Sequence, residues 1–143
     1  MTIAVDFDGT IVEHRYPKIG EEKPFALETL KMLQKAHHQL ILWTVREGVL
    51  LDEAVEWCRQ RGLEFYAVNK DYPEENCDTC KNPNYSRKLK ADLFIDDRNL
   101  GGMLDWGKIY HMIMDNKSIL DLIAEARMQQ LNLTSSKKPW WKF

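Results

Sequence analysis

Short, mainly apolar runs alternate along this chain with longer segments in which apolar residues recur every three or four positions. The runs predict four buried strands, and they lie at 2–5, 40–43, 63–68 and 91–95. The longer segments have the spacing of amphipathic helices, and they lie at 24–37, 50–58, 106–113 and 119–126. Because strands alternate with helices, the pattern favours an α/β fold with a parallel sheet and helices on both faces.

Two polar segments interrupt this alternation. Residues 11–23 contain Pro17 and Gly20 and are typical of a loop, which we call the flap. Residues 69–87 show no sustained period and predict a long loop, and long loops in compact domains are usually functional or disordered.

Size and charge narrow the classes of protein. The 143 residues give room for one domain, which we expect to span 1–143, with a core over 1–131 and a tail over 132–143. The net charge of −2 gives no general attraction to nucleic acid or to an anionic membrane. No apolar stretch approaches the roughly 20 residues that cross a bilayer, and the chain begins with a core strand rather than a signal segment. Three cysteines are an odd number and too few for a disulfide-stapled secreted domain, so we expect a cytoplasmic protein with no membrane partner.

Acidic residues follow two of the predicted strands. Asp6 and Asp8 come after the first strand, and Asp96 and Asp97 come directly after the fourth. Thr44 follows the second strand. Because ligands of open α/β sheets bind at the carboxyl ends of the strands, we expect these side chains to share one edge.

The set has the chemistry of phosphoryl transfer. A carboxylate that attacks phosphorus needs a divalent cation to offset its repulsion with the phosphoryl oxygens. It also needs a hydroxyl and amides to hold those oxygens, and a cation such as Lys88 for the developing charge. An acidic turn alone would also suit a surface turn or a simple cation site, but the complete set favours phosphoryl transfer.

This ordered set resembles the four motifs of the haloacid dehalogenase (HAD) superfamily hydrolases, over the span from Ile3 to about Asn99. The resemblance implies a three-layer Rossmann-like sheet of about four core strands in the order 4-1-2-3. It also implies a Mg²⁺-dependent reaction through a covalent aspartyl-phosphate. One departure is that the fifth strand usual after the acidic pair is replaced by the predicted helix that begins at Trp106.

The resemblance also assigns roles to the four aspartates. Asp6 is implied as the nucleophile and a metal ligand, and Asp8 as the general acid and base. The Asp8 carbonyl and the Asp96 carboxylate are implied to complete the protein part of the metal shell, and Asp97 to act through a bound water.

Phosphate binding is implied for three further residues. Thr44 would bind a phosphoryl oxygen, Gly9 is assigned to the phosphate site with it, and Lys88 would neutralise charge on the nucleophile and the phosphoryl group. Lys88 opens a Lys-x-x-Ala-Asp run as in relatives, but the nearby Lys90 is an open alternative.

Two features select a branch of the superfamily. Asp8 provides the acid and base that a phosphatase needs, whereas dehalogenases of the superfamily lack it and the ion-pumping ATPases carry threonine there. Only about a dozen residues separate Thr10 from the first helix, and one helix, one strand and a loop fill most of 44–88, so no large cap domain is expected. The resemblance is therefore to the capless phosphatases, which tend to act on macromolecules or phosphorylated ends, or to close the site with a second subunit.

Three residues are candidates for substrate contact. Arg46 and Arg98 are expected at the rim, where a guanidinium suits a second phosphate or carboxylate, with a rim ion pair as the alternative. His14 would reach substrate from the flap, although a lone loop histidine is more often solvated. The Thr-x-Arg run at Arg46 also resembles nucleotide and polynucleotide-end phosphatases, so a nucleic-acid end competes with a small molecule as the phosphorylated substrate.

The sequence leaves a catalytically retired binding module open as a different class of function, and it leaves open whether the protein is a homo-oligomer. Cys77 and Cys80 have half the spacing of a zinc site but no second pair nearby, which favours free thiols. The tail at 137–143 mixes cations with aromatics, as single-strand binders do, but such tails more commonly dock on their own domain.

Overall fold

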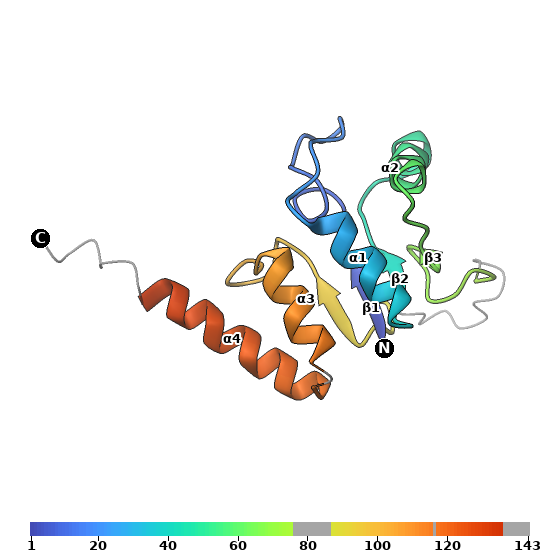
Figure 1. Cartoon of the computed structure of the whole chain (residues 1–143). Coiled ribbons are helices and arrows are strands. Elements are labelled where there is room, and N and C mark those ends of the chain that lie inside the picture. Colours follow the sequence, from blue (N-terminus) through green and yellow to red (C-terminus); the bar gives the residue numbers. More distant parts are fainter. Residues whose placement is uncertain (76–86, 116, 136–143) are drawn as a thin grey trace, which may run out of the picture.

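Four parallel strands form the centre of the protein (Figure 1). This computed structural model describes residues 1–75, 87–115 and 117–135. The sheet has the order β3-β2-β1-β4, and its strands are β1 (Thr2–Val5), β2 (Gln39–Leu42), β3 (Ala67–Val68) and β4 (Leu93–Ile95). All pairings are parallel. The predicted α/β class and the 4-1-2-3 order are confirmed.

Four helices accompany the sheet: α1 (Ala26–Lys35), α2 (Gly48–Gln60), α3 (Trp106–Met114) and α4 (Ile119–Ser135). Helix α3 takes the place after β4 where a helix was predicted instead of a fifth strand. A capping residue precedes helix α4, because the Asp121 amide donates to Ser118 Oγ over 3.2 Å. It forms the outer side of the molecule opposite α2 (Figure 1).

The strand register fixes where the chain leaves the sheet. Val5 of β1 pairs with Leu42 of β2 and with Ile95 of β4. The pairing continues past the strand end, because the Asp6 amide donates to the Ile95 carbonyl over 3.0 Å. The segments that follow β1, β2 and β4 therefore emerge side by side at one edge, with β1 in the middle.

Alternate strand residues pack into two separate clusters. The larger contains Ile3, Val5 and Leu42 together with apolar residues from all four helices. The smaller contains Ala4 and Ile41 and no helical residue; it is closed by residues 89–91 of the connection before β4. The sheet thus lies between a layer of helices and a layer that belongs to the β3–β4 connection, so the expectation of helices on both faces holds for one face within the described residues.

Strand β3 is shorter than predicted. Only Ala67–Val68 pair with β2, whereas the apolar run suggested a strand over 63–68. Leu63 is nevertheless buried in the larger cluster, and the Tyr66 amide donates to the Leu40 carbonyl. The apolar character of this run therefore reflects packing beneath the sheet edge rather than strand pairing.

No helix in the described part of the chain is long and apolar enough to cross a membrane. The predictions for Cys77, Cys80 and the aromatic tail lie outside the described residues.

Candidate functional site

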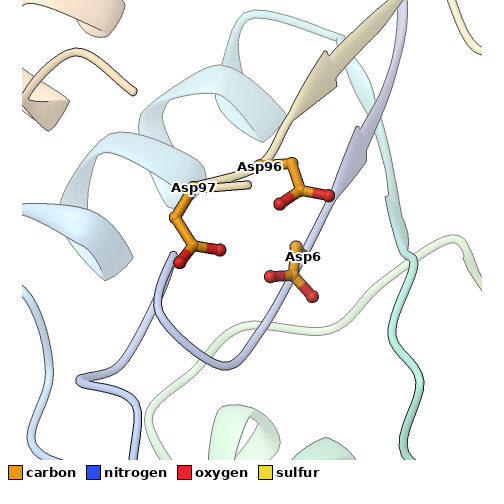
Figure 2. A group of neighbouring side chains, drawn as sticks. All are labelled: Asp6, Asp96 and Asp97. Carbon is orange, nitrogen blue, oxygen red and sulfur yellow. The ribbon is translucent and has the colours of Figure 1, made fainter. Parts of the chain in front are cut away.

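Three carboxyl groups meet where β1 and β4 end (Figure 2). Asp6 follows β1, and Asp96 and Asp97 follow β4. Each offers one oxygen, and these three oxygens lie within 4.8 Å of one another. In Figure 2 the carboxyl groups face a common space between the two strand ends. The expected convergence of the two acidic turns is therefore present.

The Thr10 hydroxyl joins the two acidic turns. It accepts a hydrogen bond from the Asp97 amide over 3.1 Å. Its single proton has two acceptors, the Asp6 carboxylate at 3.2 Å and the Asp97 carboxylate at 3.4 Å. The Thr10 carbonyl in turn accepts from the indole of the buried Trp106 over 3.0 Å. Helix α3 thus anchors the turn that carries the carboxylates.

Asp6 has an unusual affinity for protons. Its pKa is raised to about 7, first by burial and further by the negative charges of Asp96 and Asp97. Hydrogen bonds from the Phe7 amide and the Thr10 hydroxyl oppose the shift. The raised pKa of Asp6 therefore reflects its burial first and the neighbouring negative charges second.

This donor set fits a small divalent cation. Mg²⁺ prefers oxygen ligands and is commonly held by one or two carboxylates together with water and substrate oxygens. Here three carboxylate oxygens from two rigid strand ends lie within 4.8 Å. A cation between them would offset the repulsion among the three carboxylates, which contributes to the raised pKa of Asp6 after burial.

Gly9 allows the two acidic turns to approach closely. Its φ of +86° lies in the left-handed region, and a Cβ built there would lie 2.3 Å from Asp97 Oδ2. The Gly9 amide donates to the Val12 carbonyl over 2.8 Å. The Gly9 amide is thus used within the turn, and the missing Cβ leaves room for Asp97, whereas the role of Gly9 in phosphate binding stays a prediction.

Asp8 is not one of the three carboxylates that meet, and it is paired with Arg46. Arg46 Nε and Nη2 each lie 2.7 Å from an oxygen of Asp8. Both side chains are buried, with exposures of 0% for Arg46 and 8% for Asp8. The rim position predicted for Arg46 is wrong, because the buried carboxylate of Asp8 binds the guanidinium inside the protein.

Thr44 lies at the same edge, just beyond β2. Its amide donates to the Asn69 side chain over 2.8 Å, and its hydroxyl oxygen accepts from the Arg46 amide over 3.2 Å. Because the hydroxyl accepts that bond, its own proton is directed to another acceptor. Thr44 is 9% exposed and is therefore largely buried.

Lys88 and Lys90 are both exposed on the segment before β4. The Lys88 ammonium lies 5.5 Å from the centroid of the Phe94 ring, which belongs to β4. The Lys90 amide donates to the Asp71 carboxylate over 2.7 Å. Which lysine serves the phosphate site stays a prediction.

Arg98 and His14 come together above the acidic turn. Arg98 Nη2 lies 3.3 Å from His14 Nε2, and the Arg98 amide donates to the Asp96 carboxylate over 2.8 Å. Both side chains are exposed, so the flap and the end of β4 meet at the rim. These two of the three candidates for substrate contact are therefore neighbours, whereas Arg46 is buried.

Comparisons with known proteins add one relationship. No family model matches the chain, and no curated protein does either. A solved structure of a conserved protein from Bacteroides thetaiotaomicron is 71% identical, covers 85% of this chain and 96% of its own, and superposes with a TM-score of 0.75. The chain belongs to the same family as this Bacteroides protein. The family relationship extends over most of both chains.

Three residues that organise the site in this family member were missed by the sequence analysis: Thr10, Asn69 and Trp106. Thr10 lies in the acidic turn itself, so its proximity to Asp6 was a usable signal. Asn69 has a φ of +54° directly after β3, and asparagine tolerates that conformation better than most residues. Trp106 carried no signal beyond its helical spacing, because its indole partner is 96 residues away.

Proposed function

We propose that this protein is a Mg²⁺-dependent phosphomonoester hydrolase of the HAD superfamily, in its capless branch. The observation that carries the proposal is the meeting of Asp6, Asp96 and Asp97 within 4.8 Å at the carboxyl edge of a parallel sheet. The order β3-β2-β1-β4 puts the Asp6 strand between the strand that leads to Thr44 and the strand that leads to Asp96. This is the arrangement that the resemblance in the motifs implied.

The metal would be held by Asp6 and Asp96, with Asp97 acting through water. When bound, Mg²⁺ would offset the repulsion between the attacking carboxylate and the phosphoryl oxygens. The Asp8 backbone carbonyl is the remaining protein ligand that the resemblance implies. The structural support lies in the carboxylate oxygens, because they are the donors that Mg²⁺ prefers.

Asp6 is the nucleophile in the first step. Its carboxylate oxygen forms a bond to phosphorus, the bond between phosphorus and the ester oxygen breaks, and Asp8 gives its proton to the departing alcohol. In the second step water attacks phosphorus, Asp8 takes the proton of that water, and the bond to Asp6 breaks. Inorganic phosphate leaves, and both aspartates regain their starting protonation states.

Thr44 supports this reaction by orientation. Its hydroxyl accepts from the Arg46 amide, which leaves the hydroxyl proton for a phosphoryl oxygen. Lys88 remains the candidate for neutralising charge, as an exposed residue on the segment before β4. Arg98 and His14 are candidates for contact with the leaving group, because they face solvent beside Asp96.

A phosphate-release assay tests the proposal. Purified protein is incubated with 4-nitrophenyl phosphate and a panel of phosphomonoesters, with Mg²⁺ or with chelator. We expect Mg²⁺-dependent phosphate release that falls at least ~10³-fold in Asp6→Asn, because the nucleophile is removed. Release in Asp6→Asn at the wild-type rate would show that another protein or mechanism is responsible.

One argument for the alternative function, a nucleotide or polynucleotide-end phosphatase, is weakened by the structure. It relied on Arg46 at the rim, and the guanidinium is instead buried against Asp8. Comparing sugar phosphates with 3′- and 5′-phosphorylated oligonucleotides in the same assay separates the two substrate classes. A catalytically retired binding module would bind Mg²⁺ and a phosphate analogue without turnover.

A further inference from the structure

Arg46 is fully buried, and every one of its side-chain donors is used. The two oxygens of Asp8 accept from Nε and Nη2. Nη2 also donates to the Lys18 carbonyl over 3.0 Å, and Nη1 donates to the carbonyls of Pro17 at 3.1 Å and Leu50 at 3.4 Å. The five N–H groups of a guanidinium therefore have five acceptors.

Two of these acceptors belong to the flap. The Pro17 and Lys18 carbonyls hold the flap backbone on the same guanidinium that pairs with Asp8. The Tyr16 ring lies 5.3 Å from the guanidinium carbon, and the Phe7 ring lies at the same distance. Tyr16 belongs to the flap and Phe7 to the acidic turn, so the guanidinium also joins these two segments through its ring contacts.

The flap itself is closed at its base by backbone hydrogen bonds. The Glu13 amide donates to the Glu21 carbonyl over 2.7 Å, and the Lys23 amide donates to the Ile11 carbonyl over 2.9 Å. At the flap tip, residues 16–18 reach the body of the protein through the two carbonyls and the Tyr16 ring, and all three contacts end on Arg46. Arg46 therefore ties residues 16–18 to the body of the protein, next to Ile19, which packs against the larger hydrophobic cluster.

The contacts of Arg46 also restrain Asp8, which is the general acid and base in the proposed function. Both oxygens of Asp8 are occupied by the guanidinium, whereas a general acid must place a proton on the leaving oxygen. The pairing also raises the pKa of Arg46, chiefly through its hydrogen bond with Asp8, so the guanidinium stays charged. Asp8 can take up its proton-transfer role only when its contact with Arg46 is rearranged.

We propose that Arg46 is a positioning residue that ties the flap to Asp8, so that displacement of the flap tip and release of Asp8 for proton transfer are one event. The link to proton transfer rests on the proposed function, whereas the tie between flap and Asp8 does not. A lysine keeps the charge but has three donors on one nitrogen, so it cannot bind Asp8 through two oxygens and hold two flap carbonyls.

Hydrogen exchange tests the tie without any need for activity. Exchange of flap amides over 11–23 is measured by mass spectrometry in the wild type, Arg46→Lys and Asp8→Asn. We expect the flap to exchange at least ~10-fold faster in both variants, because Arg46→Lys loses contacts to the flap and Asp8→Asn weakens the ion pair that holds Arg46 in place. Asp8→Asn keeps the shape of the side chain, which guards against a folding defect. Arg59→Lys, on the exposed face of α2 with Glu56 as its partner, is the matched control and should exchange like the wild type.

A leaving-group comparison tests the effect on proton transfer. Arg46→Lys should lower kcat/KM for glycerol 2-phosphate by ~10²-fold or more, because Asp8 is no longer positioned by two hydrogen bonds and released together with the flap, and this alkoxide must be protonated as it departs. The loss for 2,4-dinitrophenyl phosphate should be much smaller, because that leaving oxygen needs no proton. Simple structural damage would reduce both rates equally.

The outcomes separate the two proposals. Unchanged flap exchange in Arg46→Lys and Asp8→Asn overturns the tie, whatever the activity. Faster exchange with equal losses on both substrates overturns the role in proton transfer. If the wild type hydrolyses no phosphomonoester while the flap still loosens, the proposed function fails and the structural tie stands.

Discussion

Gly9 is the residue at which the two acidic turns come closest. Alanine there would place its Cβ 2.3 Å from Asp97 Oδ2 and would keep a φ of +86°. We expect Gly9→Ala to lose stability by more than the roughly 1–2 kcal/mol that left-handed backbone costs, and to lose Mg²⁺ affinity. Thermal unfolding and calorimetric Mg²⁺ titration measure the two effects.

Gly102→Ala provides the matched control for that experiment. Its φ is +78°, and a Cβ at Gly102 meets no atom within 4 Å. The control therefore carries the backbone cost without displacing a carboxylate. Equal Mg²⁺ affinity in the two variants would contradict the steric role of Gly9.

Asp6 should make the metal-free protein less stable as the pH rises. Its pKa is about 7 in the folded state and 3.8 in the reference state, so between these values the native protein holds a proton that the unfolded chain has lost. Stability therefore falls with increasing pH through this window. In chelator, Asp6→Asn should have a higher Tm than the wild type at pH 8, and the difference should shrink towards pH 4.

Thermal unfolding between pH 4 and pH 8 checks this sign. Asp52→Asn, on the exposed side of α2, controls for the loss of one acidic group. A Tm difference between Asp6→Asn and the wild type that stays constant across the range would exclude the raised pKa.

At the residue level, the sequence predicted where the acidic side chains lie better than it predicted which residues they contact. Asp6, Asp96 and Asp97 follow strands, so their convergence follows from a parallel sheet in which β1 and β4 are neighbours. The Asp8–Arg46 pair could not be inferred from spacing, since 38 residues separate its members. Opposite charges just beyond two buried strands were the available signal, because such charges are paired when the fold buries them.

Among the elements, α3 links the helical layer to the site through its first residue, Trp106. Asp105 caps this helix by accepting from the Lys108 amide over 3.0 Å. Asp105→Ala should cost about 1 kcal/mol of stability, because the helix loses that acceptor. Thermal unfolding measures the cost.

Asp105→Asn is the matched variant for the cap. It removes the exposed ion pair with Lys108 but keeps an oxygen that can accept the amide hydrogen. We expect the Asn variant to stay close to the wild type in Tm. A loss as large as that of the Ala variant would assign the effect to charge rather than to capping.

Periodicity predicted the helices better than the strands. Helix α3 spans Trp106–Met114, close to the predicted 106–113, because its apolar positions face the core at regular intervals. Strand β3 was overestimated, since an apolar run does not distinguish pairing from burial beneath an edge. Helix α1 begins at Ala26 rather than at Pro24, because Phe25 adopts a left-handed conformation with a φ of 65°.

For the whole molecule, a cation that binds only the native state should stabilise all of it. At a Mg²⁺ concentration 100 times the Kd, the gain is about 2.7 kcal/mol. It should be larger at pH 8 than at pH 5.5, because a proton on Asp6 competes with the metal. Thermal unfolding with Mg²⁺ or chelator measures the gain.

Asp96→Asn tests whether that gain comes from the three-carboxylate group. It removes one of the charges that meet within 4.8 Å but leaves the strand unchanged. We expect most of the Mg²⁺-induced rise in Tm to disappear. An undiminished rise would locate the cation elsewhere on the protein.

The strand order could be predicted from the order of the motifs and from the alternation of strands with helices. The layer that covers the second face of the sheet could not. Right-handed crossovers and the implied strand order gave β3-β2-β1-β4. The expectation of helices on both faces came from the alternation of strands and helices, although residues 69–87 were predicted to form a long loop. Among the described residues of the β3–β4 connection, Leu89 and Ala91 belong to the same hydrophobic cluster as Ala4 of β1.

The indole of Trp106 is an intrinsic fluorescence probe of the three-carboxylate group. Its N–H is bonded to the backbone of Thr10, whose hydroxyl contacts both Asp6 and Asp97. Any ion that reorders these oxygens changes the electric field at a ring that is only 2% exposed. A shift in ultraviolet emission on titration, absent in Trp106→Phe, would let occupancy be followed in real time without a label.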